Sequence, residues 1–339
     1  MNNGSERAKT SRPNLFDYAT SELSQDAFFI WLFRYADPQF QDDFELHRTA
    51  QKFVSLFLDD YSSPIKEIKV WKQWANIDIT VEVNGAVGII IEDKVGAHLH
   101  GDQLRRYREA AEKWAKDEHL RLGFFYLNTE NPNTDDRENI KKEQYKMIKR
   151  SELLRILNGY SGANPILCDF RDKLSIIESE TEAYKMRPFN TWTFRAWQGF
   201  YDWIHSIRSD STWDWLNPPS GAFLGMWWNN HGEWINGEVA LYPQIDQGRF
   251  TFKMYCENDS NKEWGYRLRN SLEEIAHEFA VDEIHRPARL SFKGYATALL
   301  VVEPEEYLGT GNIDLNAVIK KFELYEKVIE MCKARFRTK

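Results

Sequence analysis

Residues 76–95 read NIDITVEVNGAVGIIIEDKV, and this stretch decides how the first half of the chain folds. Apolar residues alternate with polar ones from residue 77 to residue 83, which predicts a half-buried β-strand. Asn84-Gly85 is a strong turn signal, and residues 86–91 are apolar throughout, as in a central strand that is covered on both faces. The stretch therefore predicts a β-hairpin whose most apolar strand ends on three charged residues, Glu92, Asp93 and Lys94.

The length of the hairpin loop decides whether Asp78 and Glu92 can meet. A two-residue loop would place the two side chains on opposite faces of the sheet. A three-residue loop, with the glycine in the left-handed conformation, pairs Glu82 with Ala86 and Asp78 with Ile90, so that Glu92 becomes the diagonal neighbour of Asp78. We favour the three-residue loop because it brings two carboxylates and the ammonium of Lys94 to one place.

This combination of charges suits a metal ion and a phosphate group. Two neighbouring carboxylates repel each other unless a counter-charge lies between them. Mg²⁺ takes oxygen ligands and keeps several waters, so one or two carboxylates are sufficient to hold it. Such a metal activates water and stabilises charge on a phosphoryl oxygen, and a lysine beside it can orient the water or neutralise the phosphate. The main-chain carbonyl of Asp93 is the expected third ligand.

An aspartate, a turn and then Glu-x-Lys at the end of an apolar strand resemble the motif of the PD-(D/E)XK nuclease superfamily. Asp78, Glu92 and Lys94 match that motif residue by residue, and Ile77 replaces its usual proline. The resemblance covers about residues 15–130 and says little about residues 190–339. It implies that these three residues are catalytic and that Asp78 and Glu92 bind Mg²⁺ or Mn²⁺. The competing interpretation is a solvated strand end, which the accompanying motifs disfavour.

Three further groups of residues extend the resemblance. Gln103-Leu-Arg-Arg-Tyr107 resembles the QxxxY motif of RecB-type nucleases, and its first and last residues share a helix face. The motif implies a catalytic role for Gln103 and nucleic-acid contacts for Tyr107, Arg105 and Arg106. Tyr107 could instead belong to the core, and surface arginines are usually only solvated. Glu22 resembles an acidic residue on the first helix of many members, and is either an additional metal ligand or a residue suited to the helix dipole.

The fold expected from these patterns is an α/β, restriction-endonuclease-like core with a central mixed β-sheet flanked by helices. Helix 20–36 should bury a stripe of Leu23, Ala27, Phe28, Trp31, Leu32 and Tyr35. Residues 128–143 are predicted to be a long polar loop. The other predicted elements of this half are helices at 46–58, 103–116, 151–157 and 165–184, and strands at 67–71, 122–127 and 145–148.

Composition divides the chain into three segments. Residues 1–13 are predicted to be a disordered N-terminus, residues 14–186 the nuclease-like domain, and residues 187–339 a tryptophan-rich α+β domain of unknown role. Eight of the 13 tryptophans lie in residues 190–234. We expect most of them to be buried in a core, and stacking on bases is the alternative. The tryptophan-rich domain would select the substrate or sense a signal.

The overall composition limits the class of protein. The chain has 339 residues with 44 Lys and Arg against 52 Asp and Glu, a net charge of −8, so it has no basic arm for nucleic acid. Its three cysteines lack any CxxC spacing, which disfavours a zinc knuckle or a disulfide framework and favours the reducing cytoplasm. Neither a signal peptide nor an apolar run of about 20 residues is found, so no membrane association is expected.

These patterns together predict a metal-dependent nuclease that hydrolyses phosphodiester bonds in DNA. The resemblance implies a role in restriction, phage defence or repair. The alternative is a catalytically silent, nuclease-like module that binds nucleic acid or serves in assembly. The oligomeric state is left open, and a homodimer is possible.

Overall fold

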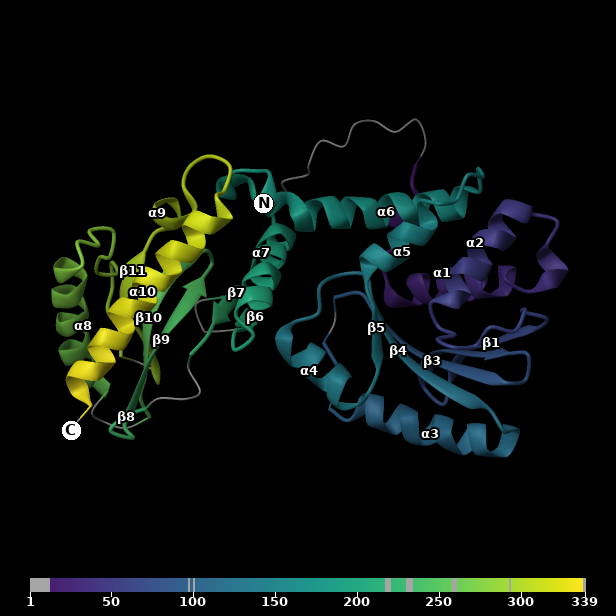
Figure 1. Ribbon diagram of the computed structural model, residues 1–339, viewed down its shortest axis with the longest axis horizontal. Coiled ribbons are helices and arrows are strands. Elements are labelled where there is room, and N and C mark those ends of the chain that lie inside the picture. The colour runs from purple at the N-terminus through teal and green to yellow at the C-terminus, as the bar shows by residue number, and fades with distance from the viewer. Residues whose placement is uncertain are drawn as a thin grey trace. The chain divides into compact units, whose positions relative to one another are not determined.

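The computed structural model describes residues 13–96, 98–99, 101–216, 221–229, 234–257, 261–292 and 294–337. The chain divides into two compact units, Met1–Ser179 and Glu180–Lys339 (Figure 1). The boundary between the units therefore lies slightly before the one that the sequence predicts, which is after residue 186. Most of the N-terminal segment for which disorder is predicted, residues 1–12, lies outside the described residues.

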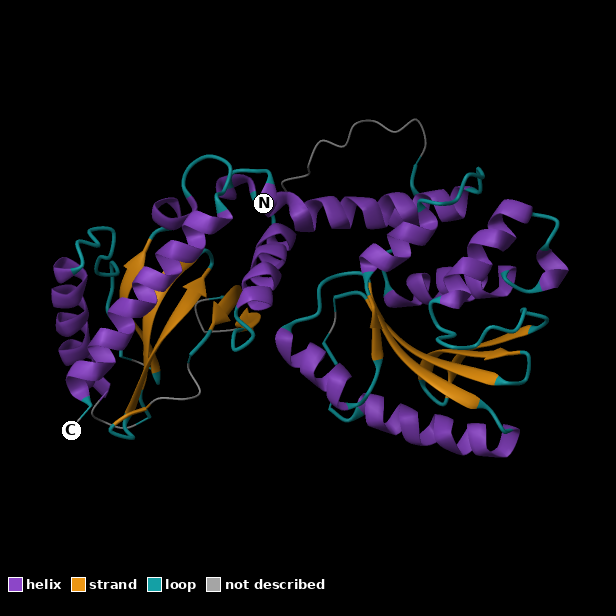
Figure 2. Cartoon of the chain, viewed as in Figure 1, coloured by secondary structure: helices purple, strands orange, loops and turns teal. Residues whose placement is uncertain are grey.

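The first unit is built around a five-stranded mixed sheet (Figure 2). The first three strands pair with one another in antiparallel, and the last two continue the sheet in parallel with the third. The strands lie side by side in chain order: β1 (Ile68–Trp74), β2 (Ile77–Val83), β3 (Val87–Lys94), β4 (Arg121–Asn128) and β5 (Lys146–Ile148). The predicted α/β fold class with a central mixed sheet is confirmed.

Helices cover both faces of this sheet, so β3 is buried along its whole length. Four helices pack on the face that carries Ile89 and Ile91, and the other two pack on the face of Ile90 (Figure 1). The first group consists of α1 (Glu22–Tyr35), α2 (Phe44–Ser55), α5 (Arg150–Leu157) and α6 (Pro165–Thr181), and the second of α3 (Gln103–Glu118) and α4 (Thr134–Lys142). Short 3-10 helices cover Leu15–Asp17 and Pro38–Phe40.

The β2–β3 hairpin has the predicted parity but not the predicted register. Its loop has three residues, and Val83 pairs with Val87 rather than Glu82 with Ala86. Asn84 causes the difference, because it adopts a left-handed conformation (φ 57°) and its Oδ1 accepts hydrogen bonds from the main-chain N of residues 66 and 67. The loop therefore begins one residue later. Since both registers have the same parity, Asp78 and Glu92 still lie on one face of the sheet.

Two other predictions for this unit are wrong. β2 is not half-buried: Thr80 and Glu82 are buried as well, because a helix covers the second face of the sheet and Lys69 pairs with Glu82 at 2.8 Å. The predicted polar loop contains α4, which the Asn133 side chain caps by accepting a hydrogen bond from the main-chain N of Asp136. Only one apolar residue of this helix is buried, so its sequence lacks the usual apolar period.

The buried face of α1 also differs from the predicted stripe. Leu23 is 52% exposed, and the buried residues are Gln25, Asp26, Phe28, Phe29, Leu32 and Phe33. Phe29 stacks on Phe53 of α2 at a centroid distance of 5.7 Å, which sets how α1 is rotated about its axis. This rotation turns two polar side chains, Gln25 and Asp26, toward the sheet.

The second unit is an α+β unit, as predicted, and its sheet is antiparallel. Its sheet has the order β11-β10-β9-β7-β6, with the short β8 paired to β9. The strands are β6 (Thr212–Leu216), β7 (Phe223–Trp227), β8 (Trp234–Ile235), β9 (Val239–Asp246), β10 (Arg249–Tyr255) and β11 (Ala296–Val302). The helices are α7 (Phe194–Ile207), α8 (Asn261–Glu278), α9 (Pro304–Leu308) and α10 (Leu315–Phe336), and short 3-10 helices cover Glu182–Lys185 and Phe189–Thr191.

The tryptophans of the second unit are less buried than predicted. Of the eight in residues 190–234, only Trp213 and Trp228 are fully buried, whereas Trp215 and Trp234 are exposed. The other four are half-buried, and three of them pack on the core cluster that α7, α8 and α10 form with the sheet. Three of the eight rings therefore cover the edge of the core, and only two lie within it.

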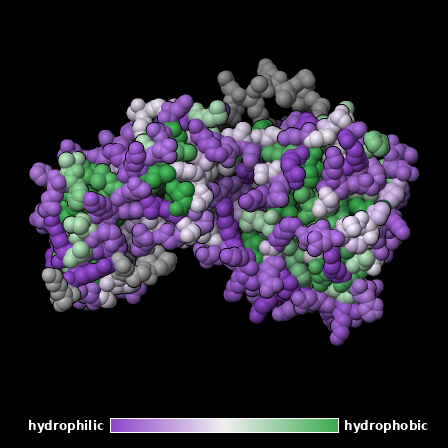
Figure 3. All heavy atoms as spheres, in the orientation of Figure 1, coloured by the Kyte–Doolittle hydropathy of each residue, from purple (hydrophilic) through white to green (hydrophobic). Residues whose placement is uncertain are grey.

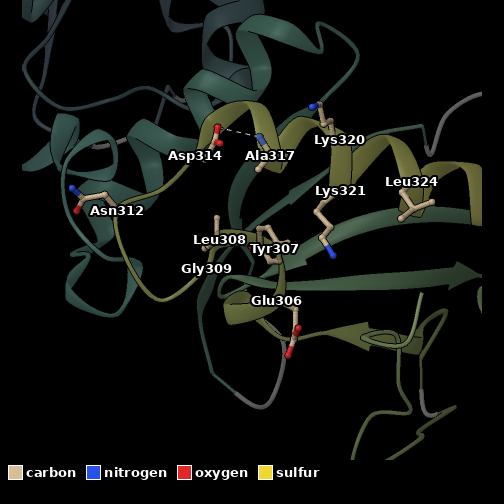
Figure 4. A pocket seen from close by; sticks show the side chains of 10 residues that line it. All are labelled: Glu306, Tyr307, Leu308, Gly309, Asn312, Asp314, Ala317, Lys320, Lys321 and Leu324. Carbon is tan, nitrogen blue, oxygen red and sulfur yellow. Dashed lines mark hydrogen bonds between the residues drawn. The ribbon is translucent and has the colours of Figure 1, made fainter. Parts of the chain in front are cut away.

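The surface of the described chain is mixed in character. Hydrophobic groups occur between hydrophilic ones on the face of the molecule drawn in Figure 3. A hollow of about 550 Å³ opens between α9 and α10, where Tyr307 and Leu308 lie near Lys320 and Lys321 (Figure 4). Glu306 also lines it, so the hollow does not favour one sign of charge.

None of the described helices has the length and apolar character needed to cross a bilayer.

The packing of α2 predicts a difference between two of its phenylalanines. Phe53 is 1% exposed and contacts the rings of Phe29, Phe33 and Phe57, so Phe53→Ala should lower the free energy of unfolding of the first unit by about 3–5 kcal/mol. Phe44, on the same helix, is 66% exposed, and Phe44→Ala should leave it nearly unchanged. Urea denaturation of the two variants tests this, and equal effects would contradict the packing described for α2.

Candidate active site

The centre of the site is the carboxyl end of β3, where charged residues follow the apolar run. Glu92 and Lys94 continue the face of Ile90, which packs against α3, and Asp93 continues the face of Ile91 toward α1. All three charged residues are buried, with exposed fractions of 0% for Glu92 and Asp93 and 7% for Lys94. β4 holds this end in place, because its parallel pairing with β3 continues as far as Lys94.

Asp78 reaches the site from β2. The last β2–β3 pair joins Ile79 and Ile91, and beyond it the Asp78 carboxylate replaces the main chain: its Oδ2 accepts a 3.0 Å hydrogen bond from the main-chain N of Asp93. Since the N–H and C=O of one strand residue point to the same edge, the Asp93 carbonyl faces Asp78 as well. Two carboxylates and one carbonyl, the groups that the sequence suggests as metal ligands, are thus neighbours.

The two oxygens of Glu92 have different surroundings. Oε1 accepts hydrogen bonds from Lys94 Nζ at 2.6 Å and from Gln103 Nε2 at 2.8 Å. Gln103 Nε2 also contacts the hydroxyl of Tyr107 at 2.9 Å, one turn further along α3. Oε2 is buried and has no hydrogen-bond partner. The network therefore fixes the carboxylate through one oxygen and leaves the other unbonded.

Burial raises the pKa of Glu92 to about 8, and the charge of Asp78 adds to the shift. The ammonium of Lys94 opposes this shift without cancelling it. For Lys94 itself, burial lowers the pKa, but the carboxylate of Glu92 outweighs burial and the net shift is upward. Lys94 therefore stays protonated at neutral pH, whereas the free protein holds a proton on Glu92 that a second positive charge would displace.

The residues present fit a divalent cation. An unbonded, buried carboxylate oxygen beside a second carboxylate and a main-chain carbonyl is a set of hard oxygen donors, as Mg²⁺ requires. Among the described residues no three His, Cys, Asp or Glu side chains gather into a larger metal cluster. Glu22 lies at the side of Lys94, with Oε2 3.9 Å from Nζ and Oε1 accepting from the main-chain N of Val95. Its role as a ligand stays a prediction.

The predicted nucleic-acid contacts lie on α3. Arg105 and Arg106 are exposed, and both bind the carboxylate of Asp102, at 2.6 and 3.0 Å. Tyr107 is 7% exposed and packs with Ile90 in the core, so its hydroxyl, rather than its ring face, is the part of it that belongs to the site. Contacts of these three residues with nucleic acid stay predictions.

Three polar residues on the other face of β3 were not expected. Gln25, Asp26 and Thr129 are buried around the Asp93 side chain, and Gln25 Nε2 donates to Asp93 Oδ1 at 2.7 Å. Burial raises the pKa of Asp26 to about 6, and burial together with the charge of Asp26 raises the pKa of Asp93 well above its usual value. One feature of the sequence could have indicated that Gln25 is buried. It lies four residues before Phe29, and residues four apart share one face of a helix.

Comparison with known proteins identifies one family. The family model described as the PD-(D/E)XK nuclease superfamily matches residues 13–211, more than half of the chain. Searches of curated proteins and of solved structures give no match. The five-stranded mixed sheet flanked by helices is consistent with a restriction-endonuclease-like fold. The RecB-type QxxxY subtype is not part of this match and stays a prediction.

The raised pKa of Glu92 predicts that metal binding depends on pH. Below about pH 8 the cation must displace the proton on Glu92, so the affinity for Mn²⁺ should rise with pH, by up to about tenfold per unit, and level off above pH 8. Isothermal titration calorimetry from about pH 6 to about pH 9 measures this dependence directly.

Glu92→Gln is the matched variant for this measurement. The amide cannot ionise, so the variant should bind Mn²⁺ more weakly and should lose the part of the pH dependence that comes from residue 92. A wild-type affinity that does not change across the range would contradict the assignment of Glu92 as a ligand.

Proposed function

Because the chain belongs to the PD-(D/E)XK nuclease superfamily, we propose that it is a metal-dependent nuclease that hydrolyses phosphodiester bonds in DNA. The observation that carries this proposal is the convergence of Asp78, Glu92 and Lys94 at the end of β3, with a buried carboxylate oxygen left unbonded. Such an oxygen costs free energy unless a cation or proton satisfies it. Mg²⁺ or Mn²⁺ is the proposed cofactor.

Each residue of the site has a distinct role in this proposal. Asp78, the free oxygen of Glu92 and the Asp93 carbonyl hold the cation. A bound Mg²⁺ supplies a Lewis acid for the phosphoryl oxygen and lowers the pKa of a bound water. Lys94 keeps its ammonium within reach of the scissile phosphate, where it stabilises developing negative charge and orients the attacking water. Gln103 occupies the first oxygen of Glu92 and so keeps the second directed at the cation.

The alternative, a silent module that only binds nucleic acid or serves in assembly, is less well supported by the energetics of the site. Burying Glu92 and Lys94 costs desolvation free energy, and such a pair is readily replaced by apolar residues where chemistry does not need it. A silent module has no reason to keep this pair together with Asp78 and Gln103. The full set of four residues therefore favours the enzyme.

Nuclease activity can be tested directly. Linear duplex, circular duplex and single-stranded DNA, with RNA as a fourth substrate, are incubated with the full chain in the presence of Mg²⁺, Mn²⁺ or EDTA. Cleavage of DNA that requires the metal is expected. Cleavage of RNA alone would contradict the proposed substrate, and binding of DNA without cleavage of any substrate would favour the silent module.

Lys94 is predicted to act in the chemistry and not in binding of the metal. Lys94→Ala should retain Mn²⁺ binding, because an ammonium cannot be a ligand, and should lose about 10²–10³ in cleavage rate. Asp78→Ala and Glu92→Ala should instead weaken the metal site, so a higher Mg²⁺ concentration should recover part of their activity. Cleavage rate against Mg²⁺ concentration separates the two behaviours.

The control for this series is Lys113→Ala, which removes an exposed lysine from α3 and should cleave at the wild-type rate. Thermal melts establish that each variant is folded. Wild-type cleavage by Lys94→Ala would remove the role assigned to that residue.

A further inference from the structure

The face of β3 opposite the proposed metal site carries a network of buried polar side chains. Gln25 of α1 and Thr129, the residue after β4, are 1% and 0% exposed, and Asp93 between them is 0% exposed. Gln25 and Thr129 belong neither to the family motif nor to the set of proposed ligands. Buried polar groups with so little access to water must be held by each other, so every bond among them restrains the backbone.

The bonds of Gln25 bracket one peptide unit. Its Nε2 donates to Asp93 Oδ1 at 2.7 Å and to the main-chain O of Lys94 at 3.3 Å. The peptide between these two acceptors carries the Asp93 carbonyl, the proposed main-chain ligand. Gln25 therefore contacts the strand immediately before and immediately after the group that would face the metal.

Thr129 fixes the direction of the Gln25 amide. Its Oγ1 donates to Gln25 Oε1 at 2.7 Å, so the Nε2 side of the amide must face β3. The main-chain N of Thr129 also donates to the O of Lys94, at 3.3 Å. The hydroxyl and the main chain of one residue thus hold both the amide and the strand end that the amide contacts.

The strand end needs this support because its pairing on the β2 side has stopped. The last main-chain pair with β2 is at Ile91, and beyond it side chains hold that edge: Asp78 accepts from the main-chain N of Asp93, and Glu22 accepts from that of Val95. In a strand, fixing Asp93 on one face fixes Glu92 and Lys94 on the other. A small rotation of this segment, which pairs with β4 alone, would move both residues away from the position that the chemistry requires.

We propose that Gln25, oriented by Thr129, is a positioning residue of the active site, which holds the Asp93–Lys94 peptide so that the carbonyl faces the metal and Lys94 faces the phosphate. This inference rests on the proposed function for its consequence in catalysis. The restraint itself belongs to the metal-free protein and can be measured there.

The first measurement is amide hydrogen exchange by NMR on the metal-free full chain. In Gln25→Leu, the amides of Asp93 and Val95 should exchange about fivefold to tenfold faster, because local opening of the strand end becomes easier. The amides of Ile89 and Ile90 in the middle of β3 should be unchanged. Gln51→Leu on α2 makes the same chemical change at a half-buried glutamine and should alter none of these amides. Unchanged exchange at Asp93 and Val95 in Gln25→Leu would overturn the proposal.

Thr129 supplies a second, milder pair of variants in case Gln25→Leu does not fold. Thr129→Val removes the hydroxyl at nearly constant volume and should reproduce the faster exchange, whereas Thr129→Ser retains the hydroxyl and should restore wild-type rates. Equal exchange in the valine and serine variants would show that the hydroxyl does not orient Gln25, and would overturn the proposal as stated.

The second measurement connects the restraint to the metal and to cleavage. Gln25→Leu and Thr129→Val should bind Mn²⁺ about 10–100-fold more weakly, and kcat at saturating Mn²⁺ should fall while KM for DNA changes little. Wild-type Mn²⁺ affinity and kcat in both variants would overturn the role in the active site. A wild-type protein that neither binds Mn²⁺ nor cleaves nucleic acid would overturn the proposed function, and the exchange data would still decide whether Gln25 restrains the strand.

Discussion

The buried contact between Glu92 and Lys94 is the interaction on which the active site depends. Placing two charges where water is excluded costs several kcal/mol per ion, and their contact offsets this only when further hydrogen bonds complete it. The contact is 2.6 Å long, and Gln103 adds a second donor to the same carboxylate. The pair nevertheless leaves one carboxylate oxygen unbonded. The raised pKa of Glu92 means that this carboxyl group carries a proton in the free protein at neutral pH, and a bound metal ion would displace that proton.

The helices and strands around Glu92 and Lys94 contribute residues from their ends. α1 begins at Glu22 and α3 begins at Gln103, so the partial positive charge of each helix N-terminus lies toward the acidic strand end. β2 stops pairing there and contributes Asp78 as a side-chain substitute for the missing main-chain bond. The site is thus assembled where regular structure ends, while β4 and the helices around it keep the strand rigid. Proteins commonly build catalytic sites in this way, because strand and helix ends leave polar groups free on a rigid support.

Much of the site could be predicted from residues 76–95, since a strand alternates its side chains with period two and the loop parity then places Asp78 with Glu92 and Lys94. The register was wrong by one residue at each strand, because hydrogen bonds from residues 66 and 67 to Asn84 shift the loop. Such bonds join segments that are far apart along the chain. The α4 helix was missed because it buries a single apolar residue, and the tryptophans were expected deeper because ring type does not reveal where the core ends.

Local patterns within the sequence determined the order of the elements, the central apolar strand, the acidic pair with its lysine, and the division into an α/β unit and an α+β unit. Only the tertiary structure decided which face of α1 is buried, and with it the position of Gln25 and Asp26 behind the site. The reason is physical. An amphipathic pattern reports the average preference of side chains for water, whereas the rotation of α1 is fixed by the packing of Phe29 on Phe53 and by hydrogen bonds from Gln25 to a strand end about 70 residues away.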